Sequence, residues 1–157
     1  MVYNRQNKMK RIIILCFVGL MTITVNAQGY VDLGLSSGTR WKKTNESGYY
    51  TIKEVHNRFG TNLPSQYQWQ ELKKECKWTW TGNGYKVTGP NGNYIHLPLA
   101  GYRNGEGTVV ELSRKGTYWT STTYYGPVFF VISESEKRCC DGLIYDRERS
   151  VRLVQNY

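Results

Sequence analysis

The chain has 157 residues, of which 39% are hydrophobic, and carries a formal net charge of +9. A chain of this length buries roughly two-thirds of the surface it exposes when unfolded, so it folds without needing a metal or a disulfide. Basic proteins often bind nucleic acid, but this chain has no nucleic-acid motif and much of its basic charge lies in scattered pairs, so we expect no nucleic-acid partner. The pairs are Lys42-Lys43, Lys73-Lys74, Arg114-Lys115 and Lys137-Arg138.

Residues 1–27 have the pattern of a cleavable secretory signal peptide. An apolar segment, residues 12–25, ends with the small residues Val25 and Ala27 at the cleavage positions and follows four basic residues, Arg5, Lys8, Lys10 and Arg11. The apolar segment is shorter than the ~20 residues of a membrane-spanning helix, so we expect membrane contact only during export. The mature domain, residues 28–157, is then periplasmic, secreted or on the cell surface. There its positive charge would meet anionic glycans or envelope polymers.

Two details of export stay open. Either Met1 or Met9 fits as the initiator, because the basic residues that follow Met9 alone make an ordinary signal start. Cys16 lies inside the apolar segment and follows Leu15, whereas lipid attachment requires a small residue before the cysteine. We therefore favour a mature protein that carries no lipid.

Two helices are expected early in the mature domain. The first spans residues 50–59 and ends at Gly60 as a C-cap, and the second spans residues 65–76 and begins at Ser65 as an N-cap. In the second helix an apolar stripe recurs at helical spacing on one face and lysines are available to water on the other. The stripe consists of Trp69, Leu72 and Cys76. The pattern predicts an amphipathic helix that packs against the core.

From Lys77 onward the sequence has the pattern of strands joined by tight turns. Trp78 and Trp80 alternate with threonines, which places both indoles on one strand face, where we expect them to be buried together. An Asn-Gly turn predicts a hairpin, and the expected strands are residues 85–88, 94–97, 118–122, 128–133 and 151–154. Helices followed by antiparallel strands indicate an α+β domain with two N-terminal helices and a twisted antiparallel sheet.

Short motifs along the mature chain resemble the Fibrobacter succinogenes major paralogous domain. The resemblance covers almost all of the mature chain, and its most specific part is the run from Gly84 to Arg103. The motifs are Tyr30-Val31-Asp32-Leu33-Gly34-Leu35, Ser37-Gly38-Thr39, Trp41, Leu63-Pro64, Trp69, Leu72, Trp78-Thr79-Trp80, Gly84-Tyr85-Lys86-Val87-Thr88-Gly89, Leu97-Pro98-Leu99-Ala100-Gly101-Tyr102-Arg103, Tyr118-Trp119-Thr120-Ser121 and Ser150-Val151-Arg152-Leu153.

The resemblance implies a relative of the C-type lectin fold, found on exported and surface proteins of Bacteroidetes-type bacteria, with no established chemistry. It also implies that loops of the second half display variable binding residues. The sugar-binding calcium motifs of the C-type lectin fold, Glu-Pro-Asn or Gln-Pro-Asp with Trp-Asn-Asp, do not occur in the chain. Asp141, Asp146 and Glu148 alternate with Arg147 and Arg149, which favours surface ion pairs over a calcium site. We expect no metal and no cofactor.

Three cysteines remain after export, and their pattern indicates no catalytic site. A bridge from Cys76 to either Cys139 or Cys140 leaves one thiol free, and the sequence does not decide between the two partners. The adjacent pair lacks the C-x-x-C spacing of redox sites and the spacing of the copper-binding cysteines in the formylglycine-generating enzyme. His56 and His96 have no motif partner. We therefore expect no catalytic residue and no enzyme activity.

Tyrosine is the commonest aromatic residue, with 13 copies, and favours binding surfaces because it offers rigid contact area at low entropic cost. The candidate ligand-binding residues lie in or beside expected loops of the C-terminal half and combine stacking with charge-assisted hydrogen bonding. They are Tyr124, Tyr125, Tyr145, Arg147 and Arg149.

These observations favour an exported, non-catalytic binding or adhesin-like module of the bacterial envelope, with a glycan or an envelope protein as partner. The alternatives are a structural or assembly component of the envelope and an enzyme of unrecognised type. An exposed concavity of tyrosine and arginine would favour the binding module, and a flat apolar patch would favour the structural component. Buried titratable groups converging in a pocket would favour the enzyme.

Overall fold

The computed structural model describes residues 29–142 and 146–156, so the predicted signal peptide lies outside the described residues. The described elements, in chain order, are β1 (Tyr30–Asp32), β2 (Arg40–Lys42), α1 (Ile52–Phe59), η1 (Gly60–Asn62), α2 (Gln66–Glu75), β3 (Lys77–Trp80), β4 (Gly84–Thr88), β5 (Tyr94–Pro98), β6 (Tyr102–Arg103), β7 (Val109–Val110), β8 (Gly116–Thr123), β9 (Pro127–Ile132), β10 (Lys137–Asp141) and β11 (Val154–Gln155). No helix in this part of the chain is long and apolar enough to cross a membrane.

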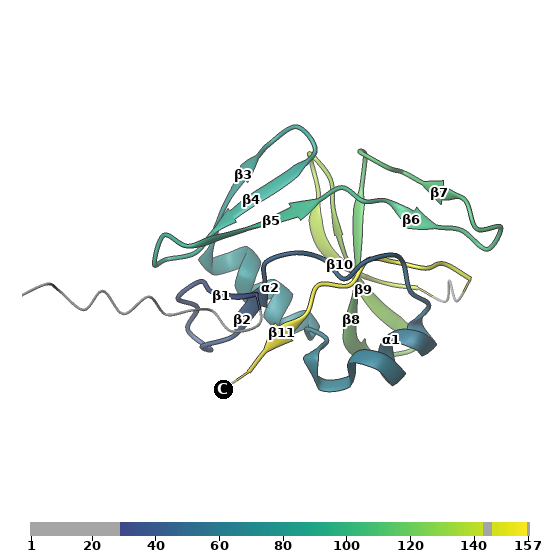
Figure 1. The fold of residues 1–157 in the computed structure, drawn as a ribbon, viewed down its shortest axis with the longest axis horizontal. Helices are drawn as coiled ribbons and strands as arrows, with labels where there is room; N and C mark the ends of the chain where they lie inside the picture. Colours follow the sequence, from purple (N-terminus) through teal and green to yellow (C-terminus); the bar gives the residue numbers. More distant parts are fainter. Residues whose placement is uncertain (1–28, 143–145, 157) are drawn as a thin grey trace, which may run out of the picture.

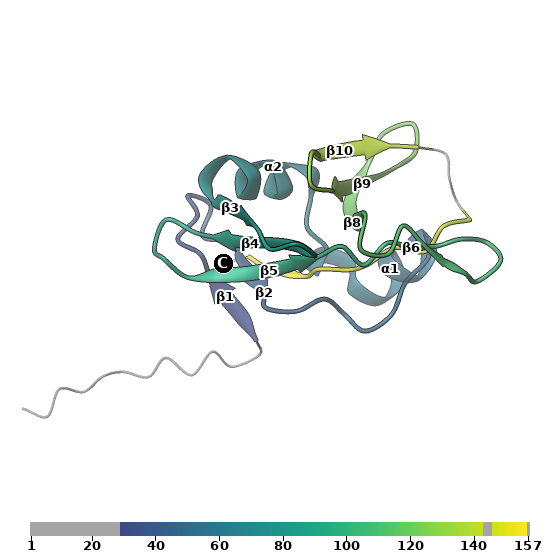
Figure 2. The same cartoon turned by 90° about the horizontal axis from the view of Figure 1, so that it is seen from above.

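The named strands form three small sheets and one two-stranded ribbon, and every pairing between them is antiparallel. The sheets have the orders β1-β2-β11, β3-β4-β5 and β10-β9-β8, and β6 pairs with β7. Both views of the ribbon place α2 beside the sheet that contains β8, β9 and β10 (Figures 1 and 2). The α+β class and the antiparallel pairing expected from the sequence are therefore confirmed, although the strands are divided among several sheets.

The two helices do not open the domain, contrary to the expectation of two N-terminal helices. Strands β1 and β2 precede them, and the last strand, β11, pairs with β2 to bring the two ends of the described chain into one sheet. Strands of three residues are too short for an alternating pattern to mark them in the sequence, and they form by pairing with each other and with β11, while Trp41 of β2 is buried in the main core. The expected strand at residues 151–154 is reduced to β11, which starts only at Val154.

Both helices begin with a capping box. Thr51 Oγ1 accepts a hydrogen bond from the Glu54 backbone N–H at 3.3 Å, and Ser65 Oγ accepts one from the Gln68 backbone N–H at 3.2 Å. In return the side chains of Glu54 and Gln68 accept hydrogen bonds from the backbone N–H of the cap residues, both at 2.8 Å. Gly60 ends α1 with a φ of 48°, so the predicted Ser65 and Gly60 caps are both confirmed.

Trp69 is the centre of the main core. Its indole lies 4.5 Å from the ring of Phe130 in β9 and 4.7 Å from the ring of Trp41, as measured between ring centroids. The predicted apolar face of α2 is confirmed, because Trp69 and Leu72 are fully buried and Cys76 is buried at the end of the helix. This packing fixes α2 against one face of the β8-β9-β10 sheet.

Trp78 and Trp80 share one face of β3, as predicted, and both indoles lie edge-on to the ring of Tyr85. Both are half-buried and pack against the main core, so they are buried together only in part. The reason is the position of β3, which is an edge strand paired only with β4.

The two faces of the β8-β9-β10 sheet have different environments. Because side chains alternate along a strand, Phe130 and its cross-strand partner Cys139 face the main core, whereas Phe129 and its partner Cys140 face the other way. All three cysteines described are free thiols. Of the two adjacent cysteines, only Cys139 packs against the core cluster that contains Cys76.

Candidate functional site

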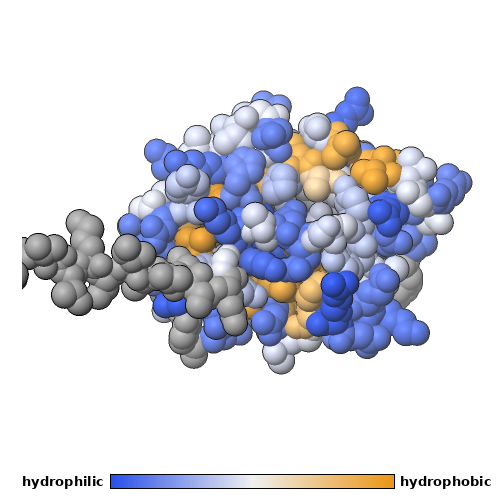
Figure 3. All heavy atoms as spheres, viewed as in Figure 1, coloured by the Kyte–Doolittle hydropathy of each residue, from blue (hydrophilic) through white to orange (hydrophobic). Residues whose placement is uncertain are grey.

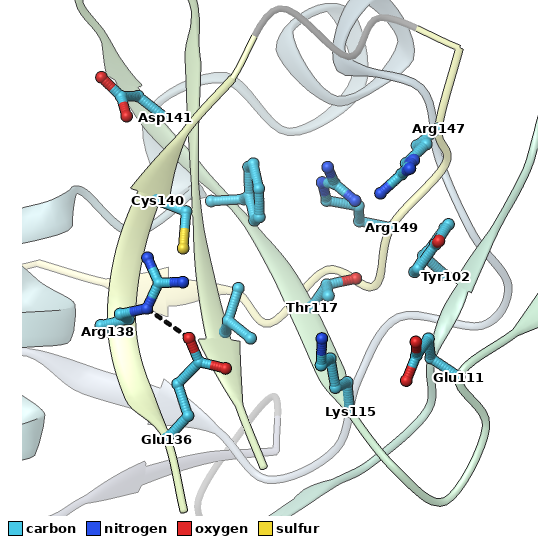
Figure 4. Close-up of a pocket in the computed structure, with 12 residues that line it drawn as sticks. Tyr102, Glu111, Lys115, Thr117, Glu136, Arg138, Cys140, Asp141, Arg147 and Arg149 are labelled. Carbon is cyan, nitrogen blue, oxygen red and sulfur yellow. Dashed lines mark hydrogen bonds and ion pairs between the residues drawn. The ribbon is translucent and has the colours of Figure 1, made fainter.

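A cavity of about 440 Å³ lies on the face of the β8-β9-β10 sheet that points away from α2. One wall is the strand face that carries Phe129, Val131 and Cys140, and the opposite wall comes from Tyr102 in β6 and from the segment that contains Arg149 (Figure 4). The volume falls within the range of small-molecule binding sites. Segments far apart in the sequence therefore build one concave surface.

Arg149 forms part of the inner wall of this cavity and is only 1% exposed. Its guanidinium carbon lies 3.8 Å from the ring centroid of Phe129 and 4.8 Å from that of Trp119, so aromatic rings hold the side chain in place. Its backbone is fixed by two hydrogen bonds with Tyr50, of 2.9 and 3.0 Å. Within the described chain, the buried Nε of Arg149 has no hydrogen-bond partner.

Arg152, three residues further along, shows how this fold satisfies a buried guanidinium. Its Nε donates to Asn45 Oδ1 at 2.8 Å, and its two terminal nitrogens donate to the backbone carbonyls of Lys42 and His96 at 2.8 and 2.6 Å. Both arginines are almost completely buried, but only Arg152 has its donors matched by acceptors. Among the described residues, the unmatched Nε of Arg149 is therefore a feature of the cavity wall.

The charge of Arg149 is affected by burial and by its neighbour. Burial, with a further contribution from the positive charge of Arg147, lowers the pKa of Arg149 to about 10, so the side chain remains a cation at neutral pH. Arg147 stacks over the ring of Tyr102 at 4.5 Å from its centroid, and Arg149 lies 5.8 Å from the same centroid. Two guanidinium groups thus converge on one tyrosine at the edge of the cavity (Figure 4).

Further charged residues line the cavity at different positions. Lys115 and Glu111 come from the segment before β8, and Arg138 on β10 forms an ion pair with Glu136 (Figure 4). In the described parts of the chain, Lys115, Arg147 and Arg149 form no ion pair. Among the described residues, the cavity therefore contains three cations that form no ion pair beside one neutralised pair.

The structure separates the residues that the sequence analysis grouped as ligand-binding. Arg147 and Arg149 line the cavity, whereas Tyr124 and Tyr125 lie on the exposed hairpin between β8 and β9 and do not line it. Tyr125 is 98% exposed, and the hydroxyl of Tyr124 accepts a hydrogen bond from Gln66 Nε2 at 2.9 Å. Tyr145 lies outside the described residues.

Tyr102 and Phe129 are two of the site residues that sequence reasoning missed. Tyr102 belongs to the run that carries the family resemblance, but nothing in that run marks it as a cavity residue. Phe129 lies in the continuous apolar strand β9, where alternation cannot show which face points to the core. The surface ion pairs expected between the acidic group and Arg147 and Arg149 do not form among the described residues, where Glu148 pairs instead with Arg103 at 2.9 Å.

The cavity offers little for nucleophilic or metal chemistry. Burial raises the pKa of the Cys140 thiol, which keeps the sulfur protonated and poorly nucleophilic. Between residues 29 and 142 and between 146 and 156, no three His, Cys, Asp or Glu side chains gather in a group that could hold a metal ion. The arrangement is suited to binding a charged group by hydrogen bonds.

The chain matches no protein-family model, no curated protein and no solved structure.

Proposed function

We propose that this chain is an exported, non-catalytic binding module of the bacterial cell envelope that holds a glycan in the cavity around Arg149. The observation that carries the proposal is the buried guanidinium of Arg149, which faces a cavity of about 440 Å³ with its Nε donor unmatched in the described chain. Aromatic rings position this donor before any ligand arrives. Because this donor is already held in place, its side chain loses little conformational entropy when a ligand binds.

A glycan fits this site better than a protein partner does. The cavity is a local concavity of about 440 Å³, lined by charged side chains that can donate hydrogen bonds to hydroxyl groups or accept them. Protein partners generally bury much broader surfaces, about 800 Å² on each side. An envelope protein as ligand is therefore the alternative that a binding screen decides.

Export and family membership are part of the same proposal. The order of charges, apolar segment and small residues at positions 1–27 supports export, and the motifs between Gly84 and Arg103 support a place in the Fibrobacter succinogenes major paralogous domain family. The α+β arrangement, with two helices and antiparallel sheets, is compatible with the C-type-lectin-like fold that this family would have.

Two observations favour a binding module over the other functional classes. The face of the molecule seen in Figure 3 is mostly hydrophilic, with apolar side chains in separate small groups, whereas a structural component of the envelope would use a continuous apolar patch. The raised pKa of the Cys140 thiol in the cavity is the opposite of what a nucleophilic enzyme requires.

The test is a binding screen of the purified exported protein against neutral and acidic glycans and against envelope proteins. Arg147→Ala removes a cation stacked on a tyrosine inside the cavity, and Lys86→Ala removes the same kind of pair, with Tyr94, outside it. We expect at least one glycan to bind, to lose at least about tenfold in affinity in Arg147→Ala, and to bind Lys86→Ala normally. Binding only to envelope proteins, or equal loss in both variants, would contradict the proposal.

A further inference from the structure

We propose that the group bound at Arg149 is an oxyanion, a carboxylate or sulfate carried by an acidic sugar residue. This inference rests on the proposed function, because it specifies the ligand of the same cavity. It requires that Arg149 present a free, directed donor, that neighbouring cations reinforce it, and that the rest of the cavity suit a sugar.

The donor requirement is met by the contrast between two buried arginines. Removing a guanidinium from water is costly unless acceptors replace the lost water, and Arg152 obtains three protein acceptors. Arg149 is buried to the same degree, but its contacts in the described chain are with the faces of Phe129, Trp119 and Tyr102, which do not satisfy its Nε–H. A planar guanidinium with a free Nε is the geometry that binds oxyanions with two parallel hydrogen bonds.

The neighbouring cations point to the same kind of ligand. Arg147 stacks on the ring that Arg149 also approaches, and Lys115 lines the cavity as well. The three cations form no ion pair with any carboxylate of the described chain. Three like charges around one cavity repel one another, and a bound anion would relieve this repulsion.

The carboxylate of Glu111 distinguishes an acidic sugar from a polyanion. Glu111 also lines the cavity, and among the described residues it forms no ion pair. Its side chain would repel a ligand that carries several negative charges, but it accepts hydrogen bonds from hydroxyl groups. A ligand with one oxyanion and several hydroxyl groups is therefore compatible with both the cations and this carboxylate.

The experiment follows the arginine Nε–H resonances of the ¹⁵N-labelled exported protein by NMR during titration. The probes are glucuronate, a neutral oligosaccharide that carries one glucuronate residue, and sulfate, with glucose as the neutral sugar and sodium chloride at equal ionic strength as the salt control. We expect saturable shifts of the Arg149 resonance with the anionic probes and none with glucose or chloride. Arg152, whose Nε is bonded to Asn45, is the internal control and should not shift.

Two variants complete the test. Arg149→Lys keeps the positive charge but removes the planar guanidinium with its Nε–H donor, so glucuronate should bind at least about tenfold more weakly. If this variant does not fold, Arg147→Ala, which changes a half-buried residue, should weaken the same titration by at least about threefold.

The outcomes separate the inference from the proposed function. A glycan that binds in the screen while glucuronate and sulfate leave the Arg149 resonance unmoved would overturn the oxyanion inference and leave the binding module standing. Equal shifts with glucose would also overturn the inference. Saturable shifts with the free anions, together with no binding of any glycan or of the oligosaccharide that carries one glucuronate residue, would support the oxyanion site and overturn the proposed glycan function.

Discussion

Trp69 stacks face to face on Phe130, with ring centroids 4.5 Å apart and planes 10° from parallel. The contact joins α2 to β9 on the core side of the sheet, and the preceding residue of β9, Phe129, contacts Arg149 on the cavity side. The core of the protein and its candidate site are therefore two faces of one strand.

Trp69→Ala should lower the free energy of unfolding by about 3–5 kcal/mol, because it empties the centre of the main core. Tyr67→Ala, in the same helix but 69% exposed, is the matched control and should change stability by less than about 0.5 kcal/mol. Urea titration followed by circular dichroism measures both values. A loss below about 1 kcal/mol for Trp69→Ala would mean that the packing of α2 is different.

Gly89→Ala should destabilise the protein by about 1–3 kcal/mol through steric overlap. A Cβ atom at Gly89 would lie 2.0 Å from the Leu33 carbonyl oxygen, so the backbone would have to move. Gly105 is the control position, because a Cβ there would meet only Asp146 atoms at ordinary contact distances of 3.5 Å or more. Thermal melts of the two alanine variants compare the sites, and equal melting temperatures would refute the close approach of Leu33.

The buried thiols should be protected from alkylation at pH 8. Burial raises the pKa of Cys76 and of Cys139 from 9 to about 11, which reduces the thiolate fraction roughly 100-fold at this pH. Iodoacetamide should therefore modify Cys76 at least about tenfold more slowly in the native protein than in urea, as followed by peptide mass spectrometry. Equal rates in the two states would show that Cys76 is accessible and that burial does not raise the pKa of its thiol.

Processing in the host should produce a mature protein that begins at Gln28, because Val25 and Ala27 supply small side chains at the cleavage positions. Mass spectrometry of the N-terminal peptide of the exported protein identifies the new end. Retention of residues 12–27, or a lipid on Cys16, would refute this prediction.

Local signals in the sequence predicted much of the fold. Ser65 as a cap and the spacing of Trp69 and Leu72 placed α2, because capping and periodicity act within a few residues. The Asn-Gly turn placed the hairpin of β4 and β5 for the same reason. Strands β1 and β2 carry no comparable local signal, since their stability comes from pairing with each other and with β11 at the far end of the chain.

For the candidate site, the sequence indicated two of the residues but not their arrangement. The sequence singled out Arg147 and Arg149, and the structure places both at one cavity. It did not show that Arg149 would be buried, because an arginine between acidic residues resembles a member of surface ion pairs. The stacking of Arg149 on Phe129 depends on the register between distant segments, which no local pattern encodes.

The most direct test of the central claim is the affinity of a glycan found in the screen, measured by isothermal titration calorimetry for two folded variants. Arg147→Ala changes the cavity, and Tyr125→Ala removes a 98% exposed ring on the hairpin outside it. The cavity site predicts at least about tenfold weaker binding, or about 1.4 kcal/mol, for Arg147→Ala and unchanged affinity for Tyr125→Ala. Unchanged affinity in Arg147→Ala together with a tenfold loss in Tyr125→Ala would contradict the claim and place the ligand on the hairpin.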